Sequence, residues 1–155
     1  MGIKQQNSYH LDLDSLARNL KLTSIDVIKT TNMDIESHWF RSIGPVDLYY
    51  WKAQDKIVKH QISLFDQVVE WNEYDGVKTG YFADEREEDQ SQIICFDENI
   101  NAQVILQAVD FLNRVETIDR KLIDQFISNY RFYNRWQSGD LGRPLRKFFR
   151  RLFKK

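Results

Sequence analysis

The sequence has little cysteine, proline or glycine: one, two and six residues respectively in a chain of 155. A single cysteine, Cys95, excludes an internal disulfide and a cysteine-only metal site. Because Cys95 lies in the apolar run of residues 93–96, we expect a small buried side chain. So few prolines and glycines argue against a disordered or low-complexity chain. With 42% apolar residues, the chain has enough apolar material for one domain with its own core.

Long apolar runs and catalytic motifs are also missing. No run of about 18 apolar residues predicts a membrane span, and the first residues lack the apolar stretch of a signal peptide. No glycine-rich phosphate loop or nucleophile-elbow motif occurs. The three histidines are too far apart for metal-ligand spacing. We therefore expect no cofactor, favour a non-enzymatic function, and predict a cytoplasmic protein.

Positive charge is concentrated in residues 143–155, which hold seven basic residues and no acidic one. The other 142 residues carry 15 basic against 23 acidic side chains, a net charge of -8. On a helix, the leucines and phenylalanines of the segment form one stripe and the cations cover the rest. This candidate surface for a membrane or a partner consists of Arg143, Leu145, Arg146, Lys147, Phe148, Phe149, Arg150, Arg151, Leu152, Phe153, Lys154 and Lys155.

A cationic, apolar helix of this kind is suited to an anionic membrane or an acidic protein surface. Membrane binding would place the protein at the inner face of the membrane. The acidic body of the same chain is the competing surface, because about 12 residues do not form a stable helix alone in water. Nucleic acid is disfavoured, since the body is acidic and the phenylalanines do not alternate with arginines as stacking platforms do.

Residues 35–82 have the alternation and turn signals of an antiparallel meander. Strands are predicted over 46–52, 57–65, 68–72 and 77–82, with one more over 92–96. Gly44-Pro45, residues 53–56 and Asp75-Gly76 are the predicted turns. The pattern predicts an antiparallel sheet of four to six strands.

Helical spacing of apolar residues predicts two amphipathic helices over 101–115 and 119–136. Residues 11–30 also have helical spacing and predict two short helices, the second capped by Ser24. That pair has weak similarity to a helix-turn-helix, which leaves DNA binding as an alternative. The expected fold is α+β, with the meander packed against helices in a single domain over residues 1–138. A linker and the basic amphipathic helix follow over residues 139–155.

Aromatic residues are abundant in the predicted sheet and fall on both of its faces. Leu48 and Tyr50 are expected on one face, and Tyr49 and Trp51 on the other. We predict that Tyr49, Trp51 and Trp71 form a face that binds a protein partner. His60 is expected on the apolar side of its strand, as a hydrogen-bonded core histidine.

These features favour a non-enzymatic adaptor or regulatory protein. Its aromatic sheet face would bind a protein, and its basic tail would attach it to an anionic membrane or an acidic protein surface. One alternative is a small-molecule-binding or enzymatic domain with a pocket between sheet and helices, lined by His60 and a carboxylate. Another is an accessory protein that binds nucleic acid. A homo-oligomer is compatible with all three hypotheses.

Overall fold

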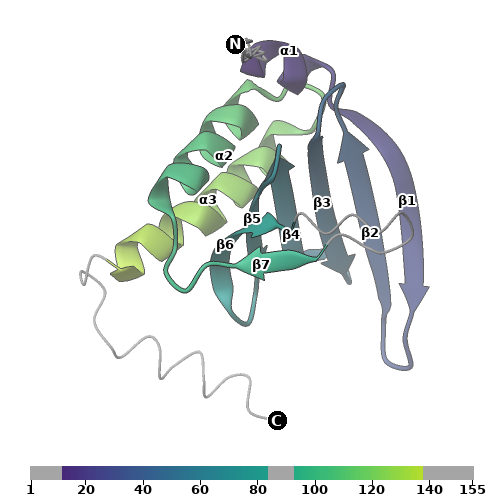
Figure 1. The fold of residues 1–155 in the computed structure, drawn as a ribbon. Helices are drawn as coiled ribbons and strands as arrows, with labels where there is room; N and C mark the ends of the chain where they lie inside the picture. The colour runs from purple at the N-terminus through teal and green to yellow at the C-terminus, as the bar shows by residue number, and fades with distance from the viewer. Residues whose placement is uncertain (1–11, 84–92, 138–155) are drawn as a thin grey trace, which may run out of the picture.

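The computed structural model describes residues 12–83 and 93–137, and in them the chain forms three helices and seven strands (Figure 1). The elements are α1 (Leu13–Arg18), β1 (Lys21–Lys29), β2 (Asp34–Arg41), β3 (Val46–Ala53), β4 (Lys56–Leu64), β5 (Gln67–Asn72), β6 (Gly76–Phe82), β7 (Ile94–Phe96), α2 (Ala102–Arg114) and α3 (Arg120–Gln137). The α+β class and the antiparallel meander predicted from the sequence are confirmed.

All seven strands belong to one sheet, in the order β1-β2-β3-β4-β5-β6-β7, and every neighbouring pair is antiparallel. Each strand therefore pairs with the strand next to it in the sequence. The predicted turns join them: Gln54 and Asp55 have φ of 50° and 63°, and Gly76 has φ of 74°. These left-handed conformations suit two-residue hairpin turns and glycine.

Residues 21–29 correct one prediction, because the expected second helix over this region is wrong. The segment is β1, an edge strand in which Ile25 lies opposite His38 of β2. Ile25, Val27 and Ile28 are β-branched and favour the extended backbone. Because residues 21–29 form a strand, they are not the second helix of a helix-turn-helix, and that motif no longer supports the DNA-binding alternative.

The helix α1 is short, with six residues from Leu13 to Arg18. Its N-cap is Asp12, whose carboxylate accepts a hydrogen bond from the Asp14 amide at 3.0 Å. Leu16 and Ala17 are fully buried, so α1 closes one end of the core.

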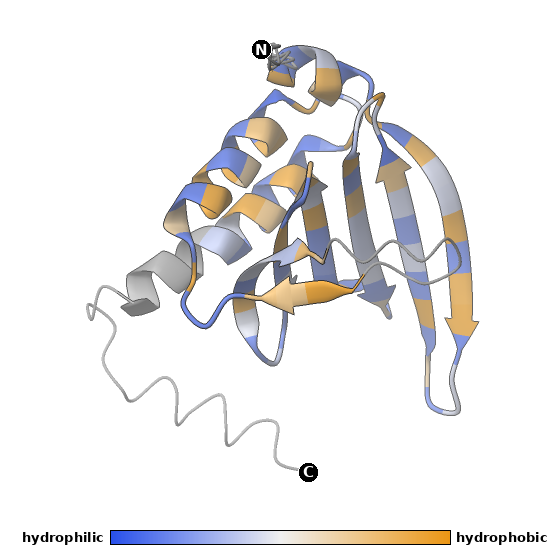
Figure 2. Cartoon of the chain, viewed as in Figure 1, coloured by the Kyte–Doolittle hydropathy of each residue, from blue (hydrophilic) through white to orange (hydrophobic). Residues whose placement is uncertain are grey.

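The helices α2 and α3 match their predicted positions to within a residue at each end. Asn101 caps α2 by accepting a hydrogen bond from the Gln103 amide at 3.1 Å. Figure 1 shows α2 and α3 side by side over one face of the sheet, and Figure 2 shows their apolar residues turned toward it. Phe111 and Phe126 are fully buried there against the sheet. We call this the helix side of the sheet, and the opposite face the open side.

None of the helices in the described residues is both long enough and apolar enough to cross a membrane. The predicted basic tail, residues 143–155, lies outside the described residues, as does its linker.

Cys95 lies on β7 and is half-buried, which is less burial than its apolar neighbours indicated.

Candidate functional site on the open side of the sheet

Three half-buried aromatic side chains form a continuous stack on the open side of the sheet. Trp39 of β2 lies directly opposite Tyr49 of β3, and Trp51 follows two residues later on β3. Successive residues of a strand point to opposite faces, so Tyr49 and Trp51 share the open side while Leu48 and Tyr50 point into the core. We call Trp39, Tyr49 and Trp51 the aromatic row.

The rings of the aromatic row are nearly parallel. The centroids of Trp39 and Tyr49 are 5.6 Å apart with an interplanar angle of 5°. Those of Tyr49 and Trp51 are 5.8 Å apart at 15°. Offset parallel stacking at this separation is favourable for aromatic pairs. The rings therefore hold one another in a fixed arrangement before any partner binds.

A cation lies over each end of the row. The Arg41 guanidinium carbon is 5.6 Å from the centroid of Trp39, and the Lys59 ammonium is 5.0 Å from that of Trp51. Both separations are within the range of cation–π attraction. In spatial order, the five groups are Arg41, Trp39, Tyr49, Trp51 and Lys59.

Two carboxylates hold these end groups in place. The Asp47 Oδ1 atom accepts a hydrogen bond from the Trp39 indole at 2.8 Å and lies 3.3 Å from the Arg41 Nε atom. The Glu70 carboxylate lies 3.2 Å from the Lys59 ammonium, and only 9% of its side chain is exposed. Burial raises the pKa of Tyr49, and the nearby Asp47 carboxylate raises it further against a lowering by Arg41. Tyr49 is therefore a neutral phenol at physiological pH.

The stacking determines what the row presents to a partner. Trp39 and Trp51 each contact one ring and one terminal cation, and Tyr49 contacts two rings. The exposed parts of the three rings and the two cations remain for outside contacts. Aromatic edges are the positive part of the ring quadrupole. The row thus offers half-exposed, stacked rings flanked by two cations.

Trp71 corrects the predicted face, because the structure separates it from Tyr49 and Trp51. Trp71 lies opposite His60 and packs against the core on the helix side. The rings of His60 and Trp71 are stacked with centroids 5.1 Å apart. His60, Trp71, Phe126 and Tyr130 form a second aromatic group, which we call the His60 cluster.

His60 is the core histidine that the sequence predicted, with both ring nitrogens hydrogen-bonded. Its Nε2 atom accepts from the Asn129 amide at 3.1 Å, so its Nδ1 atom carries the proton and donates to the Tyr130 hydroxyl at 3.0 Å. The side chain is fully buried, and this burial lowers its pKa from 6.5 to about 3. His60 does not belong to the lining of the pocket between α3 and β3, so that pocket does not have the arrangement of His60 and a carboxylate considered from the sequence.

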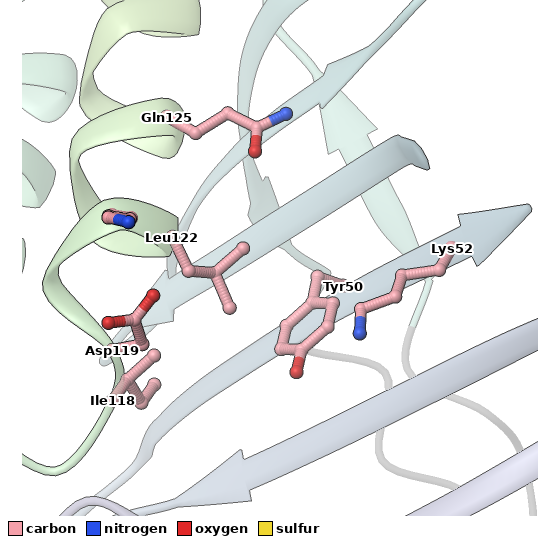
Figure 3. A pocket seen from close by; sticks show the side chains of 7 residues that line it. Tyr50, Lys52, Ile118, Asp119, Leu122 and Gln125 are labelled. Atoms are coloured by element: carbon pink, nitrogen blue, oxygen red, sulfur yellow. The ribbon is translucent and has the colours of Figure 1, made fainter. Parts of the chain in front are cut away.

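A pocket of about 430 Å³ does lie between α3 and β3 (Figure 3). It is lined by Tyr50, Lys52, Ile118, Asp119, Lys121, Leu122 and Gln125. Ile118 and Leu122 make one wall apolar, and Tyr50 and Lys52 approach from the sheet. The lining contains no histidine. In the described part of the chain, no group of three histidine, cysteine or carboxylate side chains is placed to hold a metal ion.

Sequence reasoning found Tyr49 and Trp51 but missed Trp39, Arg41 and Lys59 as members of the same site. The missing signal was strand register: Trp39 meets Tyr49, and Lys59 meets Trp51, only once the two hairpins are aligned. The predicted tail surface, residues 143–155, lies outside the described residues and stays a prediction.

No family model, curated protein or solved structure matches the chain.

Proposed function

We propose that this protein is a non-enzymatic adaptor that binds a protein partner through the aromatic row. The basic segment 143–155 supplies a second attachment, to an anionic membrane surface at the cytoplasmic face or to an acidic protein. The observation that carries the proposal is the half-exposed, pre-stacked row with a cation at each end.

The chemistry of the row favours protein over nucleic acid. Single-stranded nucleic acid binds by stacking its bases on aromatic faces, whereas the rings of the row already stack on one another and contact two cations of the same protein. Tryptophan, tyrosine and arginine are instead the side chains that contribute most at protein interfaces. The positive ring edges and the two cations suit carboxylate and carbonyl oxygens on the partner.

The rigidity of the row also favours binding. Immobilising a mobile side chain at an interface costs about 0.5–1.5 kcal/mol. Trp39, Tyr49 and Trp51 are already held by one another, by Asp47 and by the terminal cations, so little of that cost remains. A partner therefore meets a preorganised surface.

Affinity capture with matched variants tests the proposal. Wild type, Trp51→Ala and Leu106→Ala would be used as bait, because Leu106 is also exposed but lies on α2 in the opposite layer. We expect a defined protein to bind wild type and Leu106→Ala and to be lost from Trp51→Ala. That protein would then be purified and its Kd measured directly against all three baits. Equal capture and equal Kd for the three would refute the role of the row.

The tail is tested separately with vesicles. Full-length protein and a truncation ending at Gly142 would be sedimented with anionic and with neutral liposomes. We expect only the full-length protein to co-sediment, and only with anionic vesicles, with binding reduced by salt. Equal sedimentation of the two proteins would show that the tail is not a membrane anchor and would leave the test of the row unaffected.

A further inference from the structure

Among the residues that the structure describes, the strand β1 is a long edge of the sheet with no strand on its outer side. It pairs with β2 on one side only, and it lies at the border away from α2 and α3 (Figure 1). Leu22, Ile25 and Val27 are 49%, 50% and 54% exposed. A nine-residue edge with apolar side chains is a template for pairing with another strand.

The pattern of β1 is self-complementary because of a bulge at Thr23. The register against β2 shifts between Leu22 and Ser24. Leu22 lies opposite Phe40 and Ile25 opposite His38, both buried residues of the helix side, so Leu22 and Ile25 share that side although they are three residues apart. Lys21 and Asp26, opposite Arg41 and Ser37, share the open side.

We propose that two copies of this chain associate through β1, antiparallel, about a two-fold axis between Thr23 and Ser24. In that register Leu22 lies opposite the partner's Ile25, and Lys21 lies opposite the partner's Asp26. The apolar pair is on the helix side and the ion pair on the open side in both copies. The two pairs that lie within β1 outside the bulge are therefore matched in both face and chemistry.

Neighbouring registers lack this match. Centring the axis on Ile25 places Leu22, on the helix side, opposite the partner's Ile28, on the open side, and centring it on Asp26 places two carboxylates opposite each other. Like charges directly opposed across strands are unfavourable. The sequence of β1 thus selects one register.

The association has a consequence for the open side of the sheet. A two-fold axis perpendicular to the sheet joins the two sheets edge to edge and leaves both open sides on the same face of the dimer. The two aromatic rows then face the same direction. A partner with two binding sites gains from this arrangement by raised effective concentration.

Sedimentation equilibrium with charge-exchange variants tests the proposal. Wild type is expected to dimerise with a Kd on the order of 10 µM, as suits a small interface. Lys21→Glu and Asp26→Lys, each alone, place like charges opposite each other twice per dimer, and each should raise Kd about tenfold or more. The double variant Lys21→Glu/Asp26→Lys restores both ion pairs and should return Kd to near the wild-type value. Lys29→Glu is the matched control, because it makes the same charge change on β1 outside the paired residues.

A mixing experiment checks the register independently. In a Cys95→Ser background, Leu22→Cys and Ile25→Cys proteins would be oxidised alone and together. Only the mixture should form a disulfide-linked dimer, because each introduced cysteine lies opposite the other type. A wild-type protein that remains monomeric at about 100 µM would overturn the proposal. A dimer whose Kd is unchanged by Lys21→Glu would also overturn it. So would the finding that β1 binds a different protein and not a second copy of this chain.

Discussion

The aromatic row with its terminal cations and the His60 cluster lie on opposite faces of the same sheet, and they are chemically opposite. Lys59, whose ammonium lies over one end of the row, and His60 are neighbours in β4. On the open side, stacked rings end in charged Arg41 and Lys59. On the helix side, the rings surround an imidazole that burial keeps neutral.

The difference between the two groups arises from the layer above each face. The α3 helix places Phe126 and Tyr130 over His60 and removes water from it, so every polar atom must find a partner within the protein. The open side carries no helix among the described residues, so cations remain hydrated there while they contact the rings. The same aromatic content therefore gives a structural core on one face and a contact surface on the other.

The largest expected effect comes from breaking the buried group. Phe126→Ala removes a fully buried ring whose centroid is 4.5 Å from that of His60, and we expect it to lower the free energy of unfolding by about 3–5 kcal/mol. Trp51→Ala, on the half-exposed row, should cost only about 1–2 kcal/mol. Urea denaturation of both variants measures the contrast. Equal losses would mean that the row also acts as core.

Acid should destabilise the buried group through His60. Its pKa is about 3 in the folded protein and about 6.5 when unfolded, so the unfolded state binds more protons between these values. Stability from this group is complete above pH 6.5 and falls as the pH drops toward 3. The loss reaches about 3 kcal/mol at pH 4.5. Comparing the pH dependence of unfolding in wild type and His60→Gln isolates this contribution from that of carboxylates such as Glu70. Parallel curves would show that His60 does not titrate on unfolding.

Removing one hydroxyl from each group sharpens the comparison further. Tyr130→Phe leaves the His60 Nδ1 proton buried without its acceptor and should cost about 1–3 kcal/mol. Tyr49→Phe keeps the stacking of the row and should change stability by about 0.5 kcal/mol or less. Thermal denaturation of the two variants is the measurement, and a larger loss for Tyr49→Phe would contradict the assignment of the two faces.

The two cations of the row allow a comparison within the open side. Arg41→Gln removes a side chain that is 55% exposed and should cost less than about 1 kcal/mol. Lys59→Gln should cost somewhat more, about 1–2 kcal/mol, because it leaves the buried Glu70 carboxylate without its cation. Chemical denaturation at low and high salt measures both. An Arg41→Gln variant that is the less stable of the two would reverse this ranking.

The sequence predicted those elements whose signals are local. The apolar stripe of residues 101–115 identified α2, and Asp75-Gly76 identified the turn before β6. The segment of β1 was mistaken for helix because the apolar residues Leu13, Leu16, Leu20, Val27 and Ile28 follow helical spacing over residues 11–30, although Val27 and Ile28 lie in the strand. Periodicity alone therefore selected the wrong element.

The candidate site was predicted only in part, for a related reason. Alternation within β3 correctly placed Tyr49 and Trp51 together. Whether Trp71 shares their face depends on the register of two hairpins, including a bulge between Trp51 and Lys52, and no single strand contains that information. The cations at the ends of the row are likewise set by pairing between strands.

The meander order also determines when the parts of the protein can form. Every strand pairs with its sequence neighbour, so the hairpins close short loops and are expected to form early, even while the chain is still being synthesised. The bond between His60 and Tyr130 joins residues 70 positions apart and has to wait for α3. Until that helix docks, the helix side of a finished sheet is exposed. We therefore expect docking of α3 to be the late step that ends the exposure of the sheet to chaperones and to aggregation.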